Sequence, residues 1–370
     1  MVSPAARRDA TNANDDDEKA CMYAMELLSG PIVSMTLKAA IELGLIDELL
    51  ATAGGHHAVT AEELAARLRL PAVAATAVDR MLRFLASYSV VRCTTEPGSD
   101  GNARRSYAAA PVCKWLAGHG DEGSVAPLGL LNLDKVFMEC WYSMKDAISE
   151  GLTPFDKAYG MPIFEYLRTA PNEPSNTLFN QAMASHSVIV TKKLLEFFRG
   201  FDDGVEVLVD VGGGIGATLQ MITARHARLR GVNFDLPHVI AQAPPVEGVE
   251  HVGGSMFDHI PTGNAILLKW VLHLWDDSDC AKILMNCYKA LPANGKVIVV
   301  EYVLPGSPEP TPVSQAAFLL DVVMLNRLRG GKERTEREYA ELAIKAGFSG
   351  ECKATYIFTN VWALEFHKKV

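Results

Sequence analysis

The sequence predicts an α/β fold: a mostly parallel sheet covered by helices on both faces, preceded by a smaller helical domain. From Val205 onward, short β-branched apolar segments alternate with helical segments, an order that builds parallel sheets. Before that point, apolar residues recur at helical spacing instead. The 370 residues are 49% hydrophobic and 21% charged, which supplies enough apolar side chains for two cores.

The first part of the chain is polar and then strongly helical. Residues 1–20 are rich in Asn and Asp, and we expect a disordered tail there. Helical periodicity then runs from Ala20 to Leu50, interrupted at Gly30-Pro31. A pair of helices that bends at this Gly-Pro step is therefore expected at the start of the first domain.

The next segments add helices and a hairpin. A helix begins after Thr60, whose side chain pairs with Glu63 in a capping box. Residues 90–110 predict two short strands around a Gly-containing turn. Helices followed by a hairpin are typical of a winged helix, but the basic face that DNA binding requires is missing. We therefore expect a dimerisation domain over residues 21–150 and a second domain over residues 151–370.

Composition excludes several classes of function. The net charge is −9, which argues against a nucleic-acid partner. No uninterrupted apolar run approaches 18 residues and no signal segment begins the chain, so we expect a cytoplasmic protein without membrane contact. The seven cysteines are scattered without a Cys-x-x-Cys pair, which favours reduced thiols over disulfides or a zinc site. We expect no bound metal.

The segment VLVDVGGGIGATL reads as a strand, a glycine turn and the start of a helix. Gly212, Gly214 and Gly216 allow the backbone to turn sharply and a ligand to approach it closely. Asp235 follows Gly212 by 23 residues, at the end of the next predicted strand, where a carboxylate can accept hydrogen bonds from a ribose. The motif indicates an adenosine-containing cofactor. By itself it does not distinguish a nicotinamide dinucleotide from S-adenosylmethionine.

Three further residues point to acid–base chemistry. His273 follows the predicted strand AILLKW, Glu301 lies near the end of the strand KVIVVEY, and Glu333 lies just before another helix. Because ligands bind at the carboxyl edge of a parallel sheet, we expect these side chains to meet beside the glycine turn. A histidine flanked by two carboxylates is a plausible general base, since a carboxylate fixes its tautomer and stabilises its charged form.

Taken together, these segments resemble the plant S-adenosylmethionine-dependent O-methyltransferases of the caffeic-acid type. The similar stretches are LVDVGGGIGATL, GVNFDLPHVI, GVEHVGGSMF, LLKWVLHLWDDSDC, VEYVLP and GGKERTEREYAELA, together with N-terminal helices that match the dimerisation region of that family. The resemblance covers nearly the whole chain after residue 20. It implies a Rossmann-like methyltransferase domain, a homodimer through the N-terminal domain, S-adenosylmethionine as cofactor and S-adenosylhomocysteine as product.

The resemblance also assigns roles to residues. His273 is implied as the catalytic base, with Glu301 and Glu333 as its flanking carboxylates. The residues implied to bind the cofactor are Gly212, Asp235, Ser255, Met256, Phe257 and Lys269. Those implied to contact the phenolic substrate are Asn132, Phe179, Met183, Trp270, Leu274, Met324 and Leu328.

Three positions depart from the usual family pattern. Ser255 replaces an aspartate, Leu274 replaces an aspartate in the usual HDW, and Leu328 replaces an asparagine. Ser255 keeps a hydrogen-bonding group but brings no charge. Each leucine leaves a polar substrate oxygen unpaired, at a cost of about 1–3 kcal/mol. We therefore expect flatter, more apolar polyphenols such as stilbenes or flavonoids to be favoured over caffeate.

The expected reaction is transfer of a methyl group to a phenolic oxygen, with His273 neutral near pH 7 and taking the phenol proton. Two alternatives stay open. A non-catalytic dimeric binding protein of the same fold fits the three substitutions. A nicotinamide-dependent oxidoreductase needs a Tyr-x-x-x-Lys relay, and Tyr159 and Tyr288, which come nearest, lack its context.

Overall fold

The computed structural model describes residues 4–55, 57–97, 103–118, 123–169, 173–202 and 204–368, with the side chains of 4–14 and 53 outside that description. The chain forms two compact units, Met1–Leu133 and Asp134–Val370. The sequence analysis placed this boundary at residue 150. The helices that follow Asp134 pack against the helix at 154–159 and against the long helix at 312–327, which gives them to the second unit.

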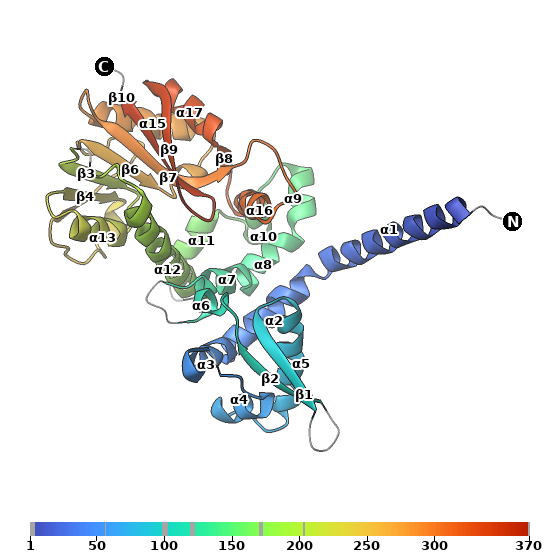
Figure 1. Ribbon diagram of the computed structural model, residues 1–370. Coiled ribbons are helices and arrows are strands. Elements are labelled where there is room, and N and C mark those ends of the chain that lie inside the picture. The colour runs from blue at the N-terminus through green and yellow to red at the C-terminus, as the bar shows by residue number, and fades with distance from the viewer. Residues whose placement is uncertain are drawn as a thin grey trace. The chain divides into compact units, whose positions relative to one another are not determined.

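The first unit is mainly helical, with one hairpin (Figure 1). Its elements are α1 (Pro4–Leu28), α2 (Gly30–Glu42), α3 (Leu45–Ala51), η1 (Thr52–Gly55), α4 (Ala61–Arg67), α5 (Ala74–Ser87), β1 (Val91–Pro97), β2 (Ala103–Ala109), α6 (Cys113–Leu116) and α7 (Ala126–Asn132). Helix α1 replaces most of the disordered tail expected for residues 1–20, of which 1–3 lie outside the described residues. From Ala5 to Leu28 the chain has no Gly or Pro, and its Ala, Glu, Lys and Arg residues favour a helix.

Local signals account for the other boundaries in this unit. The break at Gly30 separates α1 from α2, as predicted. Thr60 Oγ1 accepts a hydrogen bond from Glu63 N at 3.3 Å, and Glu63 Oε2 accepts one from Thr60 N at 2.8 Å, so the predicted capping box is confirmed. Strands β1 and β2 form the predicted antiparallel hairpin, and residues 98–102 between them lie outside the described residues. The core is apolar and contains Leu45, Ile46, Leu49, Leu64, Leu82, Leu85 and Tyr107.

The second unit is built around the predicted sheet. Its strands are β3 (Val207–Val211), β4 (Arg230–Asp235), β5 (Val249–Gly253), β6 (Ala265–Lys269), β7 (Lys296–Leu304), β8 (Arg334–Thr335), β9 (Phe348–Phe358) and β10 (Val361–Lys368). The strand order is β5-β4-β3-β6-β7-β10-β9, and β8 pairs with β7 beside this path. All pairings from β5 to β7 are parallel, whereas β10 runs antiparallel to both β7 and β9.

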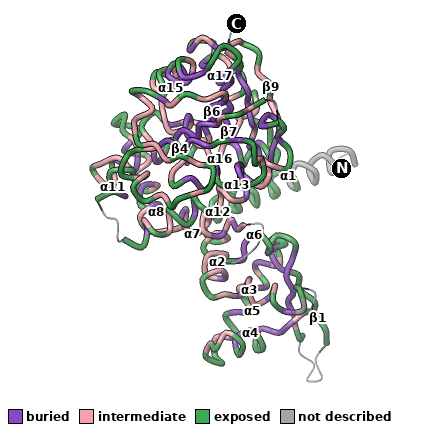
Figure 2. Tube along the Cα trace, turned by 90° about the vertical axis from the view of Figure 1, so that its left-hand side faces the viewer, coloured by how far each residue is buried: buried purple, intermediate pink, exposed green. Residues whose placement is uncertain are grey.

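Helices cover both faces of this sheet, with α12 and α13 on one face and α15 and α17 on the other. The helices of the second unit are α8 (Lys135–Tyr142), α9 (Met144–Glu150), α10 (Pro154–Tyr159), α11 (Ile163–Thr169), α12 (Pro174–Phe197), α13 (Ala217–Arg225), α14 (Pro237–Ile240), η2 (Leu272–Leu274), α15 (Asp277–Ala290), α16 (Pro312–Arg327) and α17 (Glu336–Lys345). Side chains alternate between faces along each strand. Val209 and Ile266 belong to the core that includes residues of α15 and α17, and Leu208 and Leu267 to the core that includes residues of α12 and α13. The central strands are accordingly buried (Figure 2).

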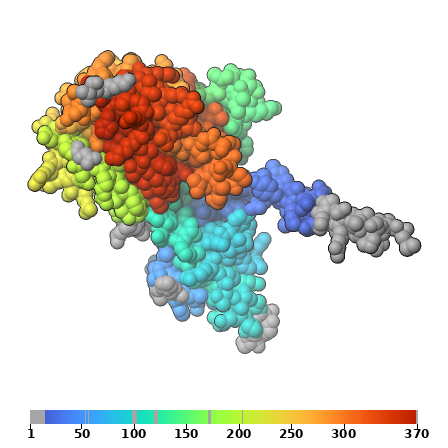
Figure 3. Space-filling model, turned by 45° about the horizontal axis from the view of Figure 1, so that its top comes forward, coloured from blue at the N-terminus to red at the C-terminus, as the bar shows by residue number. Residues whose placement is uncertain are grey.

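The sequence analysis did not predict the C-terminal hairpin β9–β10 or the two-residue strand β8. The loop of the hairpin consists of Thr359 and Asn360, with φ angles of 45° and 65°. A two-residue loop with both φ angles positive is favoured by Asn-Gly or Asp-Gly, and Thr is a poor residue for it. The usual hairpin signal is therefore missing from the sequence. The C-terminal residues, coloured red, form a continuous part of one face of the second unit in Figure 3.

Two whole-chain features bear on the earlier expectations. No single helix in the described ranges is long and apolar enough to span a membrane, although the bent pair Asp15–Leu28 and Gly30–Glu42, meeting at 47°, reaches that length and composition together. All seven cysteines lie in the described residues and are free thiols. Four of them are buried: Cys113, Cys140, Cys280 and Cys287.

Candidate active site

The glycine turn between β3 and α13 forms a cradle with open space beside it. Gly212 and Gly214 have φ angles of 72° and 60°, and no atom lies within 4 Å of the point where a Gly214 side chain would begin. At the end of β4, Asp235 Oδ2 accepts a hydrogen bond from Gly214 N at 2.8 Å, and its Oδ1 accepts one from Leu236 N at 2.6 Å. The carboxylate is thereby fixed and keeps free lone pairs for ligand hydroxyls.

A second carboxylate lies under this turn. Burial raises the pKa of Asp210, on β3, to about 6. Its Oδ2 is buried and has no hydrogen-bond partner within the described part of the chain. An unpaired buried acceptor beside an open glycine turn suits a ligand that brings a hydrogen-bond donor. The two carboxylates, Asp210 and Asp235, and the open glycine turn fit the expected S-adenosylmethionine.

The other residues expected to bind the cofactor follow β5 and β6. Ser255 Oγ accepts a hydrogen bond from Phe257 N at 3.3 Å, and Met256 O accepts one from Asn286 Nδ2 at 2.9 Å. The Phe257 ring meets the Trp275 ring edge-on with centroids 4.8 Å apart. Because Trp275 directly follows η2, this contact ties the loop after β5 to the turn that carries His273.

The turn that carries His273, residues 271–275, follows β6, and Glu301 holds its amide groups. Glu301 Oε1 accepts hydrogen bonds from the backbone N–H groups of Val271 at 2.9 Å, Leu272 at 2.8 Å and His273 at 3.4 Å. Its Oε2 lies 3.8 Å from His273 Nδ1. Glu301 is fully buried on β7, so one carboxylate fixes the turn and faces the imidazole.

Glu333 holds the imidazole ring itself. Its Oε1 lies 2.9 Å from His273 Nδ1, and its own backbone N–H donates to Asp321 Oδ1 at 2.9 Å on α16. A carboxylate can only accept in this pairing, so Nδ1 carries a proton and Nε2 is the atom available for chemistry. The structure therefore brings His273, Glu301 and Glu333 together at the carboxyl edge of the sheet.

The two carboxylates decide the charge of this histidine. Burial alone would lower the pKa of His273, but the negative charges of Glu301 and Glu333 outweigh it and raise that pKa to about 9. Burial raises the pKa of Glu301, against the opposing effect of His273. The expectation that His273 is neutral near pH 7 stays a prediction. A raised pKa favours the imidazolium, which must release the Nε2 proton before it can act as a base.

Aromatic side chains lie beside the turn that carries His273. Trp270 has a φ angle of 58°, a left-handed backbone that a bulky residue rarely adopts. Its ring lies 5.6 Å from that of His273, 5.3 Å from His186 and 4.8 Å from Tyr302, measured between centroids. Lys269 Nζ donates to Ser187 Oγ at 3.0 Å, and burial lowers the pKa of this lysine. These contacts place α12 against the end of β6.

The expected substrate-contacting residues fall on three elements of the second unit. Phe179 and Met183 lie one turn apart on α12, and the Phe179 ring stacks on Phe137 at 6.4 Å. Met324 lies three residues after Asp321 on α16, on the side of the helix that contacts Glu333. Leu274 is the last residue of η2, and Leu328 is the C-cap of α16.

Asn132 is the exception among these residues. It is the last residue of α7 and belongs to the first unit. Its expected role in substrate contact stays a prediction. Leu328, in contrast, lines a groove of about 520 Å³ within the second unit, together with Leu152, Asp156, Leu325, Arg329 and Lys332.

The sequence analysis missed several residues that contact this site. His186 follows Met183 by three residues and Phe179 by seven, so helical spacing alone was a signal for a common face. Burial, with the charges of Lys269 and His273, lowers the pKa of His186 to about 4, so this histidine is neutral. Tyr302 and Arg334 were also missed.

Comparisons with known proteins agree on one family. The sequence matches the O-methyltransferase domain over residues 141–349 and the O-methyltransferase dimerisation domain over residues 25–119. It is 74% identical to naringenin 7-O-methyltransferase from Oryza sativa subsp. japonica, with 100% of both chains covered. It is 59% identical to caffeic acid 3-O-methyltransferase from Zea mays, over 95% of this chain and 97% of the relative.

A solved structure shows the same fold. The crystal structure of human N-acetylserotonin methyltransferase in complex with SAM matches with a TM-score of 0.77 and 23% identity, covering 95% of this chain and 98% of that one. At this identity the likeness concerns the fold alone.

Proposed function

This chain belongs to the O-methyltransferase family, and from that premise we propose that it methylates a phenolic hydroxyl of a flavonoid, foremost position 7 of a flavanone. S-Adenosylmethionine, when bound, supplies the methyl group on a sulfonium and leaves as S-adenosylhomocysteine. Six residues would hold it at the carboxyl edge of the sheet: Gly212, Asp235, Ser255, Met256, Phe257 and Lys269. No metal ion is needed in this proposal.

The observation that supports the mechanism is the geometry of His273. Glu333 fixes Nδ1 at 2.9 Å, so Nε2 is the position that receives a proton. A phenol with a pKa of about 10 is ionised in only about one molecule in a thousand at pH 7, so a base is needed to form the nucleophile. Once His273 has lost its Nε2 proton, it accepts the proton of the substrate hydroxyl, and Glu301 and Glu333 stabilise the charge it gains. Such general-base help is worth about 10²–10⁴-fold in rate.

The choice of substrate rests on sequence identity and on two leucines. The 74% identical relative is named for naringenin, a flavonoid, and a more distant relative is named for caffeic acid. Leu274 and Leu328 offer no polar partner to a second, adjacent substrate oxygen, which disfavours catechols. In a flavanone the 7-hydroxyl is conjugated with the ring carbonyl, which makes it more acidic than an isolated phenol and eases its deprotonation. Stilbenes, which are also flat and apolar, are the second substrate class.

The test is methyl transfer from labelled S-adenosylmethionine to a panel of phenols. The panel contains naringenin, naringenin already methylated at position 7, a hydroxylated stilbene and caffeic acid. We expect the highest kcat/KM with naringenin and no label on the 7-methylated compound. Label on that compound would show that another hydroxyl is methylated. Absence of label on every phenol would favour the non-catalytic binding protein.

We also propose a homodimer formed through the first unit. Apolar side chains are exposed along α1 and α2: Met22, Met25, Leu28, Ile32 and Met35 are 63%, 64%, 84%, 58% and 46% exposed. These residues fall within or next to the match to the dimerisation domain, which begins at residue 25. Contiguous exposed apolar surface on a helix marks an interaction site. Light scattering should give twice the mass of the chain, and Met25→Glu with Leu28→Glu should shift it toward the monomer.

A further inference from the structure

Arg334 is a buried cation next to the turn formed by residues 271–275. The proposed mechanism gives it no role. It lies on β8, which pairs in parallel with β7 through Arg334 and Val303 (Figure 1). Its side chain is 0% exposed. An arginine buried to this degree has to place all its donors, so its partners indicate what it fixes.

The partners of Arg334 lie on both sides of His273. Nη1 donates to the carbonyl of Leu272 at 2.9 Å, and Nη2 donates to the carbonyl of Trp275 at 2.8 Å. Nε and Nη2 both donate to Asp277 Oδ1, at 3.0 and 2.8 Å. The planar guanidinium therefore spans the turn from its first residues to the N-terminus of α15, which a lysine cannot do with one ammonium.

Two oppositely charged side chains hold the backbone of this turn, one through its N–H groups and the other through its carbonyl groups. Glu301 accepts hydrogen bonds from its N–H groups, whereas Arg334 donates hydrogen bonds to its carbonyl groups. Glu333, the residue before Arg334, holds the imidazole ring. Backbone and ring are thus fixed by two consecutive residues of one short segment.

We propose that Arg334 is a positioning residue for methyl transfer: its guanidinium, braced by Asp277, fixes the turn that directs His273 toward the acceptor hydroxyl. This rests on the proposed role of His273 as base. A misplacement of about 1 Å in a reacting group can cost about 10²-fold in rate, so the turn has to be rigid. Asp277 is 51% exposed, so the brace reaches the surface.

Arg334 has a second effect, on charge. Glu301 and Glu333 raise the pKa of His273, and the positive charge of Arg334 opposes them. The other titratable groups that contact or face this cluster lie on six elements: His186 on α12, Lys269 on β6, Tyr302 on β7, Asp277 and Cys280 on α15, Asp321 on α16 and Tyr339 on α17. Removing the Arg334 cation should raise the pKa of His273 further, so the active, deprotonated form should appear only at higher pH.

The experiment compares Arg334→Gln with Arg334→Lys, using naringenin as acceptor. Arg334→Gln should lower kcat about 10²-fold and move the acid limb of the pH profile of kcat/KM to higher pH. Arg334→Lys keeps the charge, so its acid limb should stay in place and its loss of kcat should be smaller. Affinity for S-adenosylhomocysteine should stay within about twofold in both, since neither substitution touches the cofactor residues.

Arg337→Gln is the matched control, because Arg337 is 88% exposed and pairs only with Glu341 among the residues described. It should change neither kcat nor the pH profile. If Arg334→Gln does not fold, Asp277→Asn and Arg334→Lys test the inference in its place. Both variants should fold, and both should have a lower kcat than the wild type. Wild-type kcat in these two variants would overturn the inference. Equal losses in Arg334→Gln and Arg334→Lys, with the acid limb unmoved, would reduce Arg334 to a packing residue.

His273→Ala separates this inference from the proposed function. If His273→Ala keeps its turnover, the assignment of the base is wrong whatever the Arg334 variants show. If His273→Ala is inactive while Arg334→Gln behaves as wild type, only the inference about Arg334 fails.

Discussion

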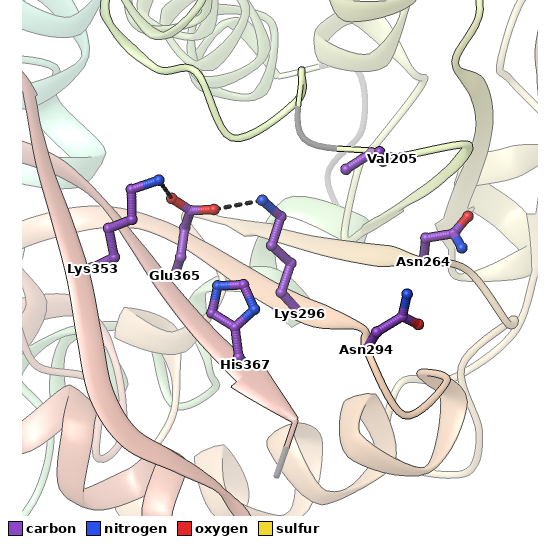
Figure 4. A pocket seen from close by; sticks show the side chains of 8 residues that line it. Val205, Asn264, Asn294, Lys296, Lys353, Glu365 and His367 are labelled. Atoms are coloured by element: carbon purple, nitrogen blue, oxygen red, sulfur yellow. Dashed lines mark hydrogen bonds and ion pairs between the residues drawn. The ribbon is translucent and has the colours of Figure 1, made fainter. Parts of the chain in front are cut away.

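Buried carboxylates lie at two places along strand β7, and their charged partners differ. At its amino end, Lys296 Nζ lies 2.6 Å from Glu365 Oε2, and Lys353 Nζ lies 3.3 Å from Glu365 Oε1 (Figure 4). One carboxylate there faces two cations, beside a cavity of about 110 Å³. Further along the strand, Glu301 and its neighbour Glu333 face one imidazole.

The difference lies in the balance of charge. At the amino end the cations satisfy the carboxylate, and no proton has to move for the group to be stable. At the carboxyl edge there is more negative than positive charge in direct contact, and the imidazole holds a proton tightly as a result. Burial, ion pairing and an excess of one charge are common to both groups, so none of these marks the candidate site. The difference is that the outnumbered group at the candidate site is an imidazole, whose proton can leave near neutral pH.

Removing the imidazole ring of His273 should have the largest effect on turnover. His273→Ala leaves two buried carboxylates without a base, and kcat should fall about 10²–10⁴-fold. Because His273 is not among the residues proposed to hold the cofactor, affinity for S-adenosylhomocysteine should be retained. Isothermal titration and labelled transfer measure both quantities in one preparation. Turnover at the wild-type rate would show that the base lies elsewhere.

The ion pairs at the amino end of β7 should affect stability and not catalysis. Lys296 is 5% exposed, and Lys296→Met removes one partner of a buried pair at a cost of about 3–5 kcal/mol in the free energy of unfolding. Lys353, whose side chain is 60% exposed, is the control, and Lys353→Met should cost about 0–1 kcal/mol. Urea denaturation gives both values. A change in kcat at a temperature where Lys296→Met is folded would contradict the separation of the two ends.

Neutralising one of the two carboxylates should change the pH dependence of the reaction. The pKa of His273 is raised to about 9, so in the wild type the base form grows as pH rises through that value. In Glu333→Gln one negative charge is lost, the imidazolium is less stable and the pKa of His273 falls. The acid limb of kcat/KM for S-adenosylmethionine should therefore move to lower pH, with a lower plateau because the ring is held less firmly. A pH–rate profile measures this, and an unmoved limb would contradict the charge argument.

The smallest change is expected from adding a carboxylate to the turn that carries His273. Leu274→Asp restores the residue that the family usually has there and gives a second substrate oxygen a partner. The ratio of kcat/KM for caffeic acid to that for naringenin should rise about tenfold. Leu274→Asn adds a polar group without charge and serves as the control. An unchanged ranking of the two acceptors would refute the role of the leucines in specificity.

Much of this site was predictable because parallel strands present their carboxyl ends at one edge. That rule placed the glycine turn, Asp235, His273 and Glu301 together from their positions in the sequence. The protonation state of His273 was not predictable, since it depends on burial and on distances to two carboxylates. Arg334 was missed because it lies in KERTER, which reads as a solvated run of charges.

The backbone of Trp270 lowers the stability of this fold. Its backbone sits in a conformation that costs a non-glycine residue about 1–3 kcal/mol, and its indole N–H has no hydrogen-bond partner among the described residues. Glycine would relieve that backbone strain, but it would also remove the ring that packs on His186, His273 and Tyr302. The strained backbone at this position is therefore the cost of keeping an indole ring beside His273.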